Sequence, residues 1–131
     1  MKTIEICGKE YPIDCNALTY KNYRSKFNTD IFSDIRTLQA FLTKQVLLAE
    51  SLKKDNPNVD DSSIISSLST LMLEDMGLFI EAATRMAYIM ILAADKKIPE
   101  YDEWLESIPT IRTNDEWIVE VTEFAVNCFC W

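Results

Sequence analysis

The sequence has no histidine, and only two glycines and four prolines in 131 residues. Histidine is the usual general base near neutral pH, so its absence removes the Ser-His and Cys-His nucleophile pairs and the helical zinc motifs. Gly8 and Gly77 alone cannot supply a phosphate-binding loop or a dinucleotide fingerprint. We therefore expect a protein that is not an enzyme and that has no catalytic, metal-binding or cofactor-binding residues.

Cysteine is also scarce, and the four are Cys7, Cys15, Cys128 and Cys130. No apolar leader precedes the first alternating residues, so we expect a reducing cytoplasm, in which such cysteines are buried thiols more often than disulfides. The C-x-C at Cys128 and Cys130 has no second ligand pair, and zinc needs four ligands. We expect no metal site there.

Positively charged residues are scarce in the second half of the chain. The net charge is −8: residues 1–54 carry 9 Lys+Arg and 6 Asp+Glu (+3), whereas residues 55–131 carry 4 and 15 (−11). A protein that binds nucleic acid usually has a basic surface, because binding neutralises phosphates. The sequence predicts no nucleic acid partner, and leaves open whether the acidic half is solvated or faces a basic partner.

The spacing of apolar residues predicts helices along most of the chain. Only residues 1–14 alternate as strands do, and Gly8-Lys9 predicts the two-residue turn of a β-hairpin. The sequence leaves open whether residues 74–77 interrupt a helix. We predict one compact domain over residues 1–131, mainly α with a minor β part (α+β), with a hairpin at 1–14 and about five or six helices within 16–129. The predicted helices are 16–27, 29–54, one from residue 60 or 61, one ending at 94, 100–107, and a last one after a capping box from Thr113 to Glu116.

The segment from Met76 to Ala94 is long and apolar enough to raise the question of a membrane. Glu81 and Arg85 interrupt it four residues apart, and charges in mid-span make a membrane helix costly. We expect a buried core helix and no membrane partner. Glu81 and Arg85 then form a buried structural pair or mark a partner-binding groove.

Aromatic residues gather near the end of the chain, where Trp104, Trp117 and Trp131 lie within the last 28 residues (131 minus 103). Most are expected in the core. Phe129 and Trp131 follow the last predicted helix turns, so they are either anchored on the domain or offered to another chain. The predicted partner-binding residues are Phe129, Trp131, Trp104, Glu81 and Arg85.

The order of these features resembles the small tail assembly chaperones of long-tailed phages and prophages of Gram-positive bacteria. The resemblance covers about residues 1–129, and it rests on the hairpin IEICGKEYPID, the helix that begins near Ala17-Leu18, and the helix start DIFSDI. A fourth element is AADKKIPEYDEWLESI before a final amphipathic helix.

The resemblance implies a non-enzymatic, self-associating chaperone in the cytoplasm of the bacterial host cell. Such proteins bind the phage tape measure protein and keep it soluble before the tail tube forms. Many have a longer form, made by a translational frameshift, that recruits the major tail protein. This chain resembles the short form.

A second reading is a small acidic regulator or inhibitor of phage or prophage origin that mimics nucleic acid. Such a mimic needs carboxylates spread over one exposed face at phosphate spacing, whereas a chaperone needs an exposed apolar groove. A carboxylate enzyme would instead need two acids converging in a cleft, which Glu81 alone does not suggest.

Overall fold

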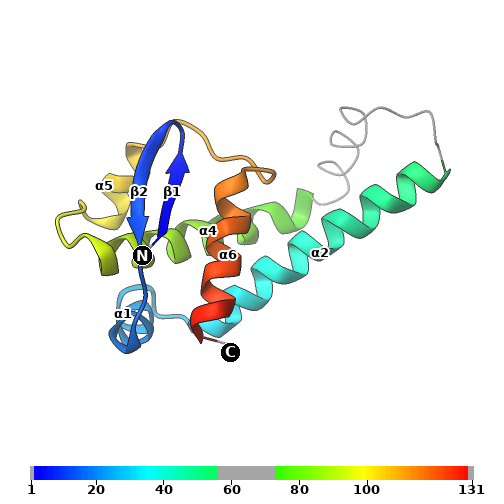
Figure 1. The fold of residues 1–131 in the computed structure, drawn as a ribbon. Helices are drawn as coiled ribbons and strands as arrows, with labels where there is room; N and C mark the ends of the chain where they lie inside the picture. Colours follow the sequence, from blue (N-terminus) through cyan, green and yellow to red (C-terminus); the bar gives the residue numbers. More distant parts are fainter. Residues whose placement is uncertain (1, 56–72, 130–131) are drawn as a thin grey trace.

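The computed structural model describes residues 2–55 and 73–129 of the chain (Figure 1). Within these ranges the chain forms one antiparallel hairpin and five helices, so the predicted mainly α class with a minor β part is confirmed. The helix predicted from residue 60 or 61 lies outside the described residues. The elements are β1 (Lys2–Ile6), β2 (Lys9–Ile13), α1 (Ala17–Phe27), α2 (Ile31–Asp55), α4 (Leu73–Ala94), α5 (Tyr101–Glu106) and α6 (Glu116–Phe129).

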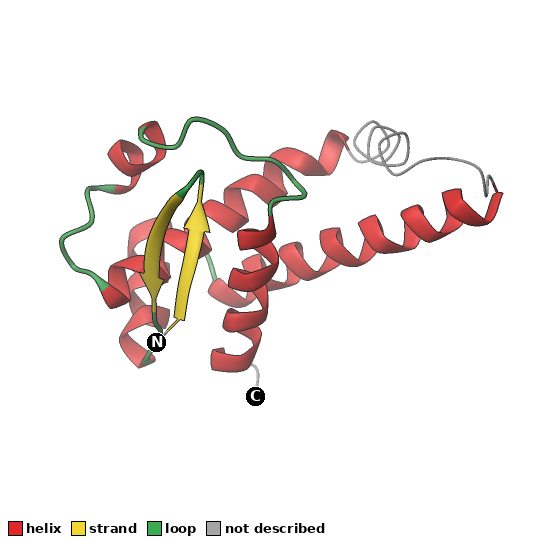
Figure 2. Cartoon of the chain, turned by 45° about the horizontal axis from the view of Figure 1, so that its top comes forward, coloured by secondary structure: helices red, strands yellow, loops and turns green. Residues whose placement is uncertain are grey.

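The hairpin closes one residue earlier than predicted. Ile6 pairs with Lys9, so the turn consists of Cys7 and Gly8 rather than Gly8 and Lys9. Cys7 and Gly8 have φ values of 52° and 83°, the left-handed conformation that a tight turn between right-twisted strands requires at both positions. The buried face of the hairpin lies beside α6 and over α4 (Figures 1 and 2). Its side chains are Ile4, Ile6, Tyr11 and Ile13.

Local capping fixes both ends of α1 and the start of α2. The Asn16 side chain accepts hydrogen bonds from the first turn of α1, and Asn28 ends the helix in the left-handed conformation. Asp30 accepts a hydrogen bond from the backbone N–H of Phe32 at the start of α2. Tyr23 packs into the core, but Tyr20, predicted on the same stripe, is exposed.

Helix α4 is the centre of the fold, and it contacts β2, α1, α2 and α6. It runs through Gly77 without interruption, which settles the question about residues 74–77. By length and composition its stretch Asp75–Ala94 could span a membrane, but 56% of an apolar window of 18 residues in this stretch is buried inside the fold. A core helix passes the same test, so this is weak evidence for a membrane.

The last two helices begin later than predicted. Pro99 lies before the N-cap Glu100 of α5, and its carbonyl accepts a hydrogen bond from the Tyr88 hydroxyl at 2.7 Å. Helix α6 begins at Glu116, two residues later than a cap at Thr113 predicts, because the Asp115 carboxylate accepts from the Arg112 N–H and holds the preceding turn.

A disulfide joins Cys15, just before α1, to Cys128 in the last turn of α6. The expectation of buried thiols is therefore wrong for both residues. They are 113 residues apart in sequence, and only the packing of the two helix ends brings them together. Cys7 is exposed, and its thiol donates to the carbonyl of Thr110 at 3.1 Å. Cys130 lies outside the described residues.

Candidate partner-binding surfaces

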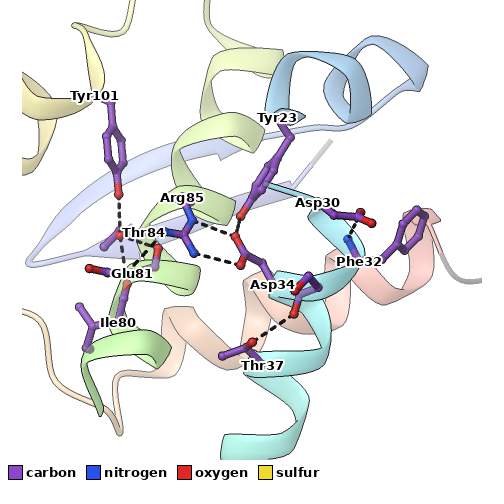
Figure 3. A network of polar contacts seen from close by, with 11 residues as sticks. Tyr23, Asp30, Phe32, Asp34, Thr37, Ile80, Glu81, Thr84, Arg85 and Tyr101 are labelled. Carbon is purple, nitrogen blue, oxygen red and sulfur yellow. Dashed lines mark hydrogen bonds and ion pairs between the residues drawn. The ribbon is translucent and has the colours of Figure 1, made fainter. Parts of the chain in front are cut away.

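A polar cluster formed by Tyr23, Asp34 and Arg85 lies between α1, α2 and α4 (Figure 3). Arg85 donates from Nε to Oδ2 of Asp34 at 2.9 Å and from Nη2 to Oδ1 at 3.0 Å. The Tyr23 hydroxyl donates to Oδ2 as well. Burial and the neighbouring carboxylate raise the pKa of Tyr23, and the hydrogen bond to Asp34 raises the pKa of Arg85. Both carboxylate oxygens of Asp34 are thus satisfied, as in a structural ion pair.

The predicted pair of Glu81 and Arg85 is a secondary contact. Its closest atoms, Arg85 Nη1 and Glu81 Oε2, are 3.8 Å apart, and the Glu81 side chain is 64% exposed. The main partner of Arg85 is Asp34, 51 residues away in sequence. Helical spacing reveals a partner on the same helix only, so this pattern could not identify Asp34.

Trp104 lies in the core and is only 1% exposed. Its ring is in edge contact with Tyr11, at 6.2 Å between centroids, and close to Tyr88 at 5.5 Å. The prediction of Trp104 as a partner contact is therefore corrected, since the fold covers its side chain.

Phe129 lines a hollow of about 580 Å³ at the C-terminal end of α6. The rings of Tyr20 and Phe32 lie 5.7 Å apart, centroid to centroid, on α1 and α2 at the opposite wall. We call this hollow the aromatic groove. Trp131, the other predicted anchor, lies outside the described residues. The remaining lining residues are Cys15, Asn16, Ala17 and Cys128.

A second candidate surface lies on α2 and the start of α4, the two helices that extend past α6 in Figures 1 and 2. Its lining mixes apolar side chains with polar ones, among them Arg36, Gln39 and Thr43. Two hollows share Ala40 and Lys44. One of about 250 Å³ reaches Leu78 on α4, and the other, of about 630 Å³, reaches Leu47 on α2. Leu47 is 59% exposed and Leu78 is 63% exposed. We call this continuous surface the arm groove.

The arm groove is not purely apolar. Lys44 Nζ and Asp75 Oδ2 form an exposed ion pair at 3.0 Å across α2 and α4. Such a pair contributes little stability in water, but it can fix the position of a polar partner group between two apolar contacts.

Carboxylates gather at the other end of α6. Glu5, Asp115, Glu116 and Glu120 line a hollow of about 650 Å³ beside the hairpin turn, together with Arg112. Among the described residues no group of three or more His, Cys, Asp or Glu side chains could hold a metal ion.

Comparison of the chain with family models, with curated proteins and with solved structures finds no match in any of the three. The resemblance to tail assembly chaperones therefore stays a prediction carried by the sequence features themselves.

Sequence patterns identified one wall of the aromatic groove and missed the others. Phe129 was predicted as a partner contact from its place near the chain end, and that role stays a prediction. Neither Tyr20 nor Phe32 was singled out as a binding residue. Phe32 lies off the buried stripe of Ile31, Ile35 and Leu38. An aromatic residue in that position on an amphipathic helix is expected to be exposed, and this pattern could have identified it.

Proposed function

We propose that this protein is a tail assembly chaperone that binds a phage tape measure protein in the cytoplasm of the bacterial host and keeps it soluble before the tail tube forms. The proposed role needs no catalysis, cofactor, nucleic acid or membrane. A longer frameshifted form would recruit the major tail protein. The sequence resemblance motivates the proposal, and the arm groove is the observation that carries it.

The arm groove suits a helical partner. A tape measure protein is a long helix with apolar stripes, and such stripes aggregate unless they are covered. Leu47 on α2 lines one hollow and Leu78 on α4 lines the other, and Ala40, a small residue that allows close approach, lines both. An amphipathic helix placed across this surface would cover apolar residues on both chains.

The test is co-expression with the product of a long helical tape measure reading frame, sought beside this gene. The double variant Leu47→Asp/Leu78→Asp should reduce the amount of soluble tape measure protein recovered with the chaperone by roughly tenfold or more, because each charge must be desolvated at the contact. Leu18→Asp is the matched control, since Leu18 is 52% exposed but lies on α1. Equal recovery with the double variant would contradict the assignment of this surface.

The alternative, a small acidic regulator that mimics nucleic acid, would use the carboxylates around Glu116 and Glu120 instead. The same experiment separates the two functions, because the arm substitutions leave those carboxylates unchanged. A wild-type protein that fails to keep any tape measure protein soluble would remove the chaperone function itself.

A further inference from the structure

Two helices of this chain carry charge of one sign only. Helix α1 has the sequence ALTYKNYRSKF, with three cations and no carboxylate, and α6 has EWIVEVTEFAVNCF, with three carboxylates and no cation. Among the described residues no ion pair joins α1 to α6. Lys26 pairs instead with Glu100, at 3.6 Å, and the charges of α1 and α6 are not paired with each other within one copy.

On α1 and α2, exposed cations come one helical turn after residues that line the aromatic groove. Lys21 comes one helical turn after Ala17, Arg24 one turn after Tyr20, and each of these cations is exposed. Side chains on a helix lean toward its N-terminus, so both lean back toward the groove.

Helix α2 repeats the arrangement at the opposite wall. Arg36 is exposed and comes one turn after Phe32, which lines the aromatic groove. Arg36 itself lines the adjoining hollow of the arm groove, so it stands between the two surfaces.

Three carboxylates lie near these residues in sequence, and each has a partner within the chain. Asp14 accepts from the N–H of Cys15 and Asp30 from the N–H of Phe32. Asp34 is buried and accepts from Tyr23 and Arg85. The groove is thus an apolar hollow with a basic border.

Helix α6 carries the complementary surface on its outer face, where Glu116, Glu120 and Glu123 surround the exposed Val119. We call these four residues the acidic ridge. Glu116 and Glu120 are one turn apart, and like charges at this spacing destabilise a helix unless cations are near. No cation lies on α6, and Arg112 is the cation that lines the same hollow as Glu116 and Glu120.

We propose that the aromatic groove is the docking site for the acidic ridge of a second copy of this chain. Val119 would contact Tyr20 and Phe32, while the ridge carboxylates would meet Lys21, Arg24 and Arg36. The exposed ring pair offers an apolar contact, and the charges fix the orientation of the ridge in the groove.

The position of the two surfaces predicts the kind of assembly. The ridge lies on the first two thirds of α6 and the groove lies at its last turn, so one copy can use both at once. An interface between two different surfaces is heterologous and extends into an open row of copies unless its rotation closes a ring. Each contact can be weak, because copies held on one filament gain avidity.

The first variant neutralises the groove border with Lys21→Gln, Arg24→Gln and Arg36→Gln. The second neutralises the ridge with Glu116→Gln, Glu120→Gln and Glu123→Gln, in a separate protein. These side chains are exposed or half-buried, and glutamine keeps a similar helix propensity and, at the glutamates, the same length, so both proteins should fold.

The measurement is sedimentation velocity over a range of protein concentrations at low salt. The wild-type protein should form species that grow with concentration and that dissociate as salt is added. Each variant alone should remain monomeric. An equal mixture of the two variants should form dimers and nothing larger, because only one intact groove and one intact ridge are available per pair.

A matched control neutralises Lys9, Lys96 and Lys97, which are exposed cations outside the groove border, and should associate as the wild-type protein does. A wild-type protein that is monomeric throughout, a variant that still associates fully, or a mixture of variants that stays monomeric would each overturn the proposal. None of these results depends on the tape measure protein, so the proposed function is tested separately.

Discussion

Arg85 on α4 holds the carboxylate of Asp34 on α2 through two hydrogen bonds, at 2.9 and 3.0 Å. Tyr23 on α1 donates to the same carboxylate. One buried acid therefore connects three helices. Because the carboxylate is shielded from water, the surrounding hydrogen-bond donors must offset the free-energy cost of burying its charge.

Replacing Arg85 should show the cost of leaving that acid without its cation. Arg85→Ala is expected to lower the free energy of unfolding by roughly 3 kcal/mol, since an unpaired buried carboxylate remains. Replacing Asp34 and Arg85 together with apolar residues of similar size should cost much less. Urea denaturation of the single and double variants measures both values.

Glu81→Ala is the control for this experiment. Glu81 is largely exposed, and its contact with Arg85 is 3.8 Å long, so the substitution should change the free energy of unfolding by less than about 0.5 kcal/mol. If Glu81→Ala cost as much as Arg85→Ala, the pair on one helix would be the important one.

Tyr23 should make the protein sensitive to alkaline pH. Burial and Asp34 raise its pKa above the ordinary value of 10.0, so above that pH the unfolded chain loses the phenolic proton while the folded chain keeps it. Stability is therefore full below pH 10 and falls as the pH rises further. Burial also raises the pKa of Tyr88 and Tyr101, which adds to the same trend.

The variant Tyr23→Phe tests this assignment. It should cost roughly 1–2 kcal/mol at neutral pH, because Asp34 loses one donor, and it should flatten the fall in stability at alkaline pH. Urea denaturation at about pH 7 and about pH 11 gives both quantities. An unchanged alkaline slope would show that Tyr23 titrates normally.

The disulfide between Cys15 and Cys128 should contribute strongly to stability. It closes a loop of more than 100 residues, 113 by sequence separation, and limiting the unfolded chain in this way is worth roughly 4 kcal/mol. Cys128→Ser should therefore lower the unfolding free energy by about that amount, whereas Cys7→Ser should have little effect. Mass spectrometry of alkylated protein from cells measures how much of the bond forms in vivo.

Trp104 should behave as a core residue and not as a partner contact. Trp104→Ala is expected to cost roughly 3–5 kcal/mol by leaving a cavity among Tyr11 and Tyr88. Trp104→Phe should cost less, because the buried indole N–H has no hydrogen-bond acceptor among the described residues and its removal loses no bond. A Trp104→Ala protein of normal stability with weakened partner binding would restore the original prediction.

The sequence by itself determined the local structure of this protein. Alternation of Ile4 and Ile6 with polar residues gave the hairpin, and Asn16 and Asn28 gave both ends of α1, because these signals act over a few residues. The buried stripe of α2 followed from helical spacing for the same reason. Two boundaries differed from prediction. The hairpin turn lies at Cys7-Gly8, one residue earlier, and α6 begins later, because local sequence signals fix the boundary of an element only to within about one or two residues.

Only the tertiary structure decided which distant residues meet. Asp34 binds Arg85 and Cys15 bonds to Cys128 because helix packing brings together segments 51 and 113 residues apart, and no short-range pattern encodes such a distance. The aromatic groove has the same origin, since its walls come from α1, α2 and α6. Periodicity tells which side of a helix is apolar, but which apolar residues remain uncovered depends on where the other helices end.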